Sequence, residues 1–265
     1  MKGLDAFRKL IPPTTMDIDI DNEQDQDQEN EARTDDEISH EQEDDDNDEI
    51  EESDDEINLE LSFANVKGIG LELMGFPKED LLVLRDGTCI CASFPTGYSQ
   101  GGLNGRNGSS ACSVISLIAG YYFTRNVFNF ETELFSDVLP LYLGCMEMGN
   151  FIHDASGFLT VQEAIGRVPS LSISAADERN LYFSDLLEFI GNIERSQFLL
   201  VISGCSTVCV TRNEENYTLF DSHQRNGRGS LIVSTRSDNL EDVVKNIFWE
   251  KKDEIGYGQY IDVYW

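Results

Sequence analysis

Residues 108–119 read GSSACSVISLIA, and here a glycine-rich stretch changes into a long apolar run. The preceding residues, 95–110, hold five glycines and almost no long apolar side chain, which predicts a loop. Over 111–122 the apolar residues cover most sides of a helix, so we expect a buried helix there. Ser109 or Ser110 is its expected N-cap. This loop-to-helix boundary is the reference point for the rest of the chain.

Cys112 lies in the first turn of this predicted helix. The start of a helix presents unpaired amide groups and a partial positive charge, and both favour a thiolate over a thiol. The glycine-rich loop leaves room for a substrate chain to approach. The alternative is that Cys112 is a buried core cysteine of an apolar helix. On this reasoning Cys112 is a candidate nucleophile.

The pattern outward from this boundary predicts an α+β fold. We expect the folded region to begin with an alternating run at 57–61 and to continue with short extended pieces at 79–84 and 89–94. Further helices are predicted over 131–148, 160–167, 184–194 and 240–249. Strands are predicted over 198–203, 207–212, 217–221, 230–234 and 259–264. A helical part followed by an antiparallel sheet predicts two layers that share one core.

The charge of the chain is concentrated in one segment. The 265 residues carry a formal net charge of −31, and residues 17–57 contain 23 Asp or Glu against one basic residue, Arg33. Such a segment has too few apolar residues to offset its ordering entropy. We therefore expect 1–57 to be a disordered, strongly acidic tail and 58–265 to form a single domain. The acidity argues against nucleic acid and against an anionic membrane surface, and it suits a basic partner.

The cysteines are expected to be reduced thiols. They are Cys89, Cys91, Cys112, Cys145, Cys205 and Cys209. Residues 1–16 lack the apolar core of a signal peptide, and no apolar run is long enough to span a membrane. These features predict an intracellular, reducing location, cytoplasmic and/or nuclear, with a virion as the alternative. Without paired histidines at zinc-site spacing, we expect neither a metal ion nor another cofactor.

Asp221 and His223 stand at the end of the predicted strand 217–221. Alternate residues of a strand share a face, so the carboxylate and the imidazole point to the same side. This spacing lets Asp221 orient His223 as a general base. A flexible loop, 224–229, follows and suits the edge of a cleft. The alternative is an Asx-type turn with a surface histidine.

The remaining candidates concern the oxyanion and a second base. Gln100, twelve residues before the candidate nucleophile, is a possible oxyanion donor through its side-chain amide. Asn104 and Asn107 are rival donors, and a solvated loop glutamine is the alternative. His153 is a second-choice base, with Asp154 beside it.

These segments together resemble the herpesvirus large-tegument-protein deubiquitinases and their viral tegument-like relatives outside viruses. The resemblance rests on Gln100, on residues 108–117 around Cys112, and on Leu219-Phe220-Asp221-Ser222-His223 with its following loop, in the same chain order. It extends over about 93–265. Ala111 departs from the family pattern, in which a polar residue such as glutamine is expected.

The resemblance implies a papain-like cysteine peptidase that hydrolyses ubiquitin conjugates. By position it assigns the nucleophile to Cys112, the base to His223, the orienting carboxylate to Asp221 and the oxyanion donor to Gln100. The expected partner is ubiquitin or a ubiquitin-like modifier. The alternatives are a peptidase for another modifier or for a polyprotein, and an inactive binding module on the same fold.

Overall fold

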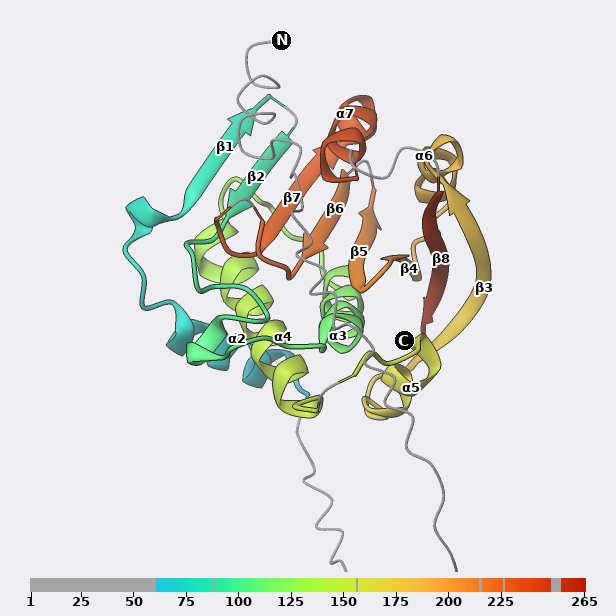
Figure 1. Cartoon of the computed structure of the whole chain (residues 1–265). Coiled ribbons are helices and arrows are strands. Elements are labelled where there is room, and N and C mark those ends of the chain that lie inside the picture. Colours follow the sequence, from blue (N-terminus) through green and yellow to red (C-terminus); the bar gives the residue numbers. More distant parts are fainter. Residues whose placement is uncertain (1–60, 88, 156, 215, 226, 249–253) are drawn as a thin grey trace, which may run out of the picture. The chain divides into compact units, whose positions relative to one another are not determined.

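Eight strands form one antiparallel sheet at the centre of the described part of the chain (Figure 1). This computed structural model describes residues 61–265 except 88, 156, 215, 226 and 249–253. The strands are β1 (Leu82–Asp86), β2 (Cys89–Ser93), β3 (Ile173–Tyr182), β4 (Gln197–Ser203), β5 (Ser206–Asn213), β6 (Asn216–Asp221), β7 (Leu231–Arg236) and β8 (Glu254–Val263). Their order across the sheet is β1-β2-β7-β6-β5-β4-β8-β3. The described residues belong to one compact unit.

Six α-helices accompany this sheet in the described residues. They are α2 (Phe63–Leu73), α3 (Cys112–Arg125), α4 (Leu139–Ile152), α5 (Val161–Gly166), α6 (Phe183–Gly191) and α7 (Ser237–Ile247). Short turns of other helix types lie at Lys78–Asp80, Leu103–Gly105 and Leu134–Val138. None of these helices has the length and apolar character needed to cross a membrane.

The two faces of the sheet bury different sets of side chains. Val208 and Val210 of β5 belong to a core cluster that includes α6 and α7. On the opposite face, α3 packs against β5, and Phe220 of β6 contacts the rings of Phe123 and Tyr142 from α3 and α4. The period-two alternation of a strand explains this division. The α+β fold with an antiparallel sheet is confirmed, but helices cover both faces, so the prediction of two layers is wrong.

Glycines allow the closest helix contacts. A Cβ added to Gly144 of α4 would lie 1.8 Å from the carbonyl oxygen of Val66 in α2, and one added to Gly70 would lie 1.6 Å from the carbonyl oxygen of Pro140. In α3, a Cβ on Gly120 would meet the Phe198 ring at 2.4 Å. Because no larger residue fits these positions, the glycines set how closely α2 approaches α4 and how closely α3 approaches the sheet.

Several element boundaries differ from the prediction. The second helix begins at Leu139 rather than at residue 131, with Pro140 in its first turn, and helix α2 and strand β3 were not predicted. The α3 N-cap is Ala111 without a side-chain cap, so the prediction of a serine N-cap is wrong; Ser109 Oγ instead accepts a hydrogen bond from the Ala111 amide at 3.1 Å. The predicted run at 57–61 and the acidic tail at 1–57 lie outside the described residues, apart from Leu61.

Candidate active site

Cys112 is the first residue of α3, and its position follows from the loop that precedes it. The residue is 2% exposed. Its Sγ lies 3.7 Å from the carbonyl oxygen of Cys205, in the turn between β4 and β5. Thr207, at the start of β5, interacts with the same sulfur through its side chain and its backbone, and its hydroxyl lies 3.1 Å from Ser113 Oγ. The sulfur is therefore enclosed by the helix start and one hairpin turn of the sheet.

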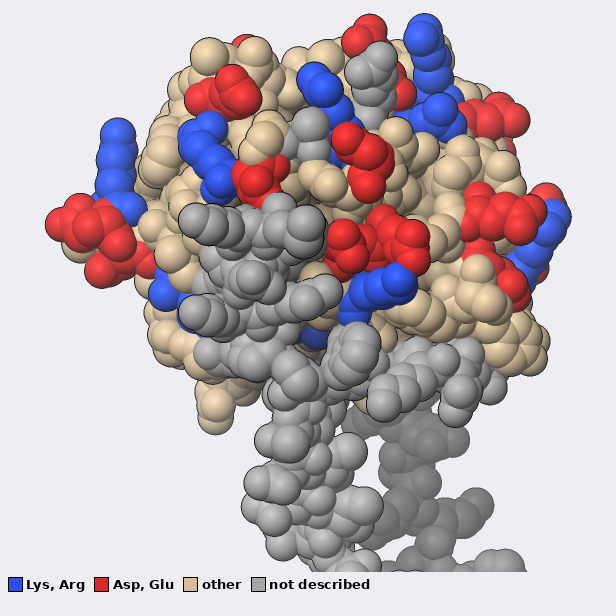
Figure 2. Space-filling view, turned by 90° about the horizontal axis from the view of Figure 1, so that it is seen from above, with Lys and Arg blue, Asp and Glu red and all other residues tan. Residues whose placement is uncertain are grey.

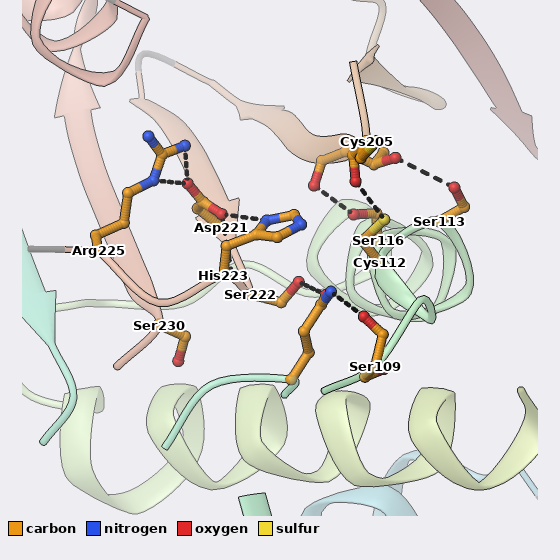
Figure 3. Close-up of polar contacts among 12 residues, drawn as sticks. Ser109, Cys112, Ser113, Ser116, Cys205, Asp221, Ser222, His223, Arg225 and Ser230 are labelled. Atoms are coloured by element: carbon orange, nitrogen blue, oxygen red, sulfur yellow. Dashed lines mark hydrogen bonds and ion pairs between the residues drawn. The ribbon is translucent and has the colours of Figure 1, made fainter. Parts of the chain in front are cut away.

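Asp221 is the last residue of β6, and His223 meets it just beyond the strand, through an Asx-type turn rather than through strand alternation. His223 Nδ1 donates to Asp221 Oδ1 at 2.8 Å, and the His223 backbone amide donates to the same oxygen at 3.1 Å. Figure 3 shows the His223 ring between Asp221 and the Cys112 sulfur. The buried Nε2 forms no hydrogen bond within the described part of the chain. The hydrogen bond at Nδ1 fixes the orientation of the ring, so that Nε2 is available for proton exchange with the Cys112 thiol.

The second oxygen of Asp221 is held by Arg225. Arg225 Nε donates to Asp221 Oδ2 at 2.6 Å, and its Nη2 also forms an ion pair with this oxygen. The Asp221 side chain is 2% exposed, whereas the Arg225 side chain is 25% exposed. One oxygen of the buried carboxylate thus accepts a hydrogen bond from the His223 imidazole, and the other accepts from the Arg225 guanidinium.

The protonation equilibria favour an ion pair between Cys112 and His223. Burial alone would raise the pKa of Cys112, but the neighbouring imidazole of His223 outweighs burial and lowers it. Burial alone would lower the pKa of His223, but Asp221 and Cys112 raise it from 6.5 to about 9. Asp221 stays ionised despite its burial, because Arg225 and His223 hold its pKa well below the ordinary value. By contrast, burial raises the pKa of Cys89 to about 11.

Gln100 is buried and links the two halves of the site. Its Nε2 donates to the Ser109 carbonyl oxygen at 3.1 Å, and its Oε1 accepts from Ser222 Oγ at 2.6 Å. Its backbone amide donates to the Ser222 carbonyl oxygen at 2.8 Å. Ser109 lies three residues before Cys112, and Ser222 directly precedes His223. The contact with Ser109 uses one of the two hydrogens of the Gln100 side-chain amide.

The other candidates lie apart from this arrangement. Asn104 and Asn107 are exposed. His153 is buried, with Nε2 at 3.2 Å from Ser110 Oγ and 2.9 Å from the Gly157 carbonyl oxygen. Asp154 pairs with Arg106 instead. His153 therefore supports the loop before the nucleophile, and His223 is the histidine that faces Cys112.

Sequence reasoning left several supporting residues without a role. Arg225 lies in the loop after β6, four residues beyond Asp221, where the alternation of strand residues no longer applies. Asn150 is fully buried; its Nδ2 donates to the Gln100 carbonyl oxygen at 2.9 Å, and its Oδ1 accepts from Ser109 Oγ at 2.7 Å. No local pattern indicates such a long-range partner.

The oxidation state of the cysteines and the presence of a metal site both affect which chemistry is available. All six cysteines are free of disulfides. Among the described residues no group of three or more His, Cys, Asp or Glu side chains is arranged to hold a metal ion. The chemistry that this arrangement can perform is nucleophilic attack by a thiolate with an imidazolium as proton donor.

Known proteins show only a distant likeness to this chain. No protein-family model and no curated protein sequence matches it. Among solved structures, it is similar to the ubiquitin-specific protease encoded by the murine cytomegalovirus tegument protein M48, in complex with a ubiquitin-based suicide substrate. The two share 13% sequence identity and a TM-score of 0.43, over 64% of this chain and 84% of that chain. This likeness is too weak to decide the function, which has to be inferred from the geometry of the site.

Proposed function

We propose that the protein is a papain-like cysteine peptidase that cleaves ubiquitin or ubiquitin-like conjugates at the modifier C-terminus. The observation that carries the proposal is the arrangement of Cys112 at a helix start, facing a histidine whose other nitrogen is bonded to a buried carboxylate. A core cysteine without function needs neither a facing imidazole nor a lowered pKa.

In this proposal the Cys112 thiolate attacks the carbonyl carbon of the scissile bond. The amide of Gln100 and the backbone amide of Cys112 stabilise the oxyanion that forms. The imidazolium of His223 protonates the leaving amine, and the sulfur remains acylated as a thioester. Water, deprotonated by His223, then attacks the thioester and releases the carboxylate product and the Cys112 sulfur.

The choice of substrate is supported by the resemblance of the segments at Gln100, Cys112 and Asp221–His223 to tegument-type deubiquitinases. The surface charge is compatible with several partners. Figure 2 shows Lys and Arg intermixed with Asp and Glu among the described residues of one face, with no large patch of a single sign. The acidic segment at 17–57 suits a basic partner. We also propose a reducing cellular location, since all six cysteines are free thiols.

A ubiquitin suicide probe tests the proposal. The wild-type chain should gain the mass of one ubiquitin, and peptide mapping should place the adduct on Cys112. The Cys112→Ala variant should lose both the adduct and the cleavage of a ubiquitin–fluorophore conjugate, while its melting temperature stays near that of wild type. Cys89→Ala is the matched control, because Cys89 is a half-buried thiol of β2 with a raised pKa.

Of three alternative results, the first and the last would contradict the proposal, and the second would narrow its substrate to a ubiquitin-like modifier. Cleavage by Cys112→Ala at the wild-type rate would exclude this residue as the nucleophile. Labelling of Cys112 by a probe built on another modifier, with no reaction toward the ubiquitin probe, would retain the peptidase and change its substrate. Saturable binding of ubiquitin without an adduct would indicate a binding module.

A further inference from the structure

The carboxylate of Asp221 has two separate partners, and only one belongs to the proposed triad. Oδ1 accepts from the His223 ring and amide, whereas Oδ2 accepts from Arg225. Figure 3 shows the guanidinium on the side of Asp221 away from the imidazole. The Arg225 guanidinium, with its fork of N–H donors, therefore holds the carboxylate from the side opposite His223, in the orientation that directs Oδ1 toward His223.

We propose that Arg225 is a positioning residue of this site: its guanidinium orients Asp221, and its charge sets the pH range in which Cys112 is a thiolate. This inference rests on the proposed function, since it assigns a role in the same site. Arg225 acts through Asp221 and His223 rather than on the substrate.

The backbone holds Arg225 in place before any substrate arrives. The Arg225 amide donates to the Arg228 carbonyl oxygen at 3.1 Å, and the Arg228 amide donates back to the Arg225 carbonyl oxygen at 2.8 Å. Gly227 within this turn has φ of 72°, a value that favours glycine. Arg228 ties this turn to β2 through the Ser93 carbonyl oxygen at 3.1 Å and to the helical turn Lys78–Asp80 through the Asp80 carbonyl oxygen at 2.6 Å. Because the turn is anchored in this way, little conformational entropy is lost when the Arg225 side chain binds Asp221.

The charges around the site balance only when Arg225 is included. Arg225 and His223 come from the end of β6 and the loop after it, and Cys112 comes from α3. Tyr142 of α4, which is neutral with a raised pKa, also faces Asp221. Cys205, in the β4–β5 turn, approaches the Cys112 sulfur through its backbone carbonyl oxygen, which carries no net charge.

With Arg225 present, the cluster is neutral whether the proton sits on Cys112 or on His223. Proton transfer between them then changes no net charge. Without Arg225 the cluster carries −1 in both states, so an additional proton binds more readily. The acid limb of Cys112 reactivity is the pH range in which the thiolate becomes protonated and loses its reactivity. This limb should consequently move to higher pH when the positive charge is removed.

The size of this shift follows from the contacts. The guanidinium lies roughly 10 Å from the Cys112 sulfur along the line through the carboxylate and the imidazole, and a unit charge at that distance with an effective dielectric constant of about 20 corresponds to about one to two pH units. If Arg225 acted only on folding, its replacement would lower the amount of active protein and would not change the pH midpoint of the acid limb.

The test measures the alkylation rate of Cys112 by iodoacetamide from pH 4 to 9 in the full chain, with peptide mass spectrometry to separate Cys112 from the exposed Cys205. Arg225→Gln removes the charge and should raise the midpoint of the acid limb by about one to two pH units. Arg225→Lys keeps the charge but not the fork. It should keep the midpoint close to wild type and lower kcat for the ubiquitin–fluorophore conjugate by about tenfold. Arg85→Gln, at an exposed position of β1, is the control for loss of one positive charge.

The outcomes separate this inference from the proposed function. An unchanged midpoint in Arg225→Gln, or an equal shift in Arg85→Gln, would overturn the role of the charge. Wild-type kcat in Arg225→Lys would overturn the role of the fork, and this variant gives an answer even if Arg225→Gln does not fold. A wild-type Cys112 that reacts only near pH 9, like an ordinary thiol, would overturn the proposed function and this inference with it.

Discussion

Replacing Asp221 by asparagine is the most informative single change in this site. The substitution keeps the shape of the side chain but removes its charge. His223 loses a charge-assisted hydrogen bond at 2.8 Å, and Arg225 loses its anionic partner at 2.6 Å. Because the Asp221 side chain is 2% exposed, water cannot replace these interactions.

The structure gives the expected magnitude. The pKa of His223 is raised from 6.5 to about 9, a difference of about 2.5 units. Asp221 is the first of the two partners that raise it, ahead of Cys112. Loss of the adjacent Asp221 charge disfavours the imidazolium, and we expect the population of the thiolate–imidazolium pair to fall on the order of 100-fold at neutral pH. The cost in stability should be about 2 kcal/mol, below the full value for a broken buried pair because Arg225 is partly exposed.

Two assays measure these effects. The rate of ubiquitin–fluorophore cleavage at pH 7.5 should fall about 100-fold in Asp221→Asn. Urea unfolding should report the loss of stability. Asp262→Asn is the matched control, because Asp262 accepts one hydrogen bond from Gln197 on β4, in a part-buried pair away from Cys112. An Asp221→Asn variant with cleavage within threefold of wild type, and with an unchanged pH profile, would refute the reasoning about His223.

Three further predictions concern the oxyanion, the packing and the pH dependence of stability. Gln100→Ala should lower kcat about 10- to 100-fold with little change in KM, measured by steady-state cleavage; a rise in KM alone would argue against oxyanion stabilisation. Gly144→Ala should destabilise the protein by about 3 kcal/mol or more in urea unfolding, because the new Cβ meets the Val66 carbonyl oxygen, whereas Gly166→Ala, with open space around it, should not. Since the folded-state pKa of Asp221 is depressed, its contribution to stability is present above about pH 4 and is lost as the pH falls through the folded value. The stability gap between wild type and Asp221→Asn should therefore narrow between pH 5 and pH 2, and a constant gap would contradict this.

The parts of the site that follow local rules were predictable from the sequence. Cys112 was found because a glycine-rich loop meets an apolar helix there, and Asp221 with His223 because they stand two residues apart at the end of a strand. The partners of Gln100 were not predictable, since Ser222 is 122 positions away and Asn150 is 50 positions away. Their contacts depend on the packing of α4 and the sheet rather than on any spacing in the chain.

The missed elements have physical reasons as well. Helix α2 contains Gly68 and Gly70, which lower helix propensity, although Gly70 is needed for the contact with Pro140. Strand β3 lies at the edge of the sheet and, among the described strands, pairs only with β8, so much of it is exposed and its sequence is polar. The start of α4 was indicated by Pro140, a residue favoured in the first turn of a helix, but the apolar pattern before it suggested an earlier start.

The order of strands across the sheet also has a consequence for how the chain folds. Strand β8 lies between β4 and β3, although it is the last of the described strands in the sequence. Strand β3 has no other hydrogen-bonded neighbour among the described strands, so this edge remains unpaired until β8 forms. The contacts that close it join residues far apart in the chain, such as Leu181 and Gly256, and such non-local pairing slows folding. We expect β3 to be the last strand to gain protection from amide hydrogen exchange during refolding, after the neighbouring strands that carry the site.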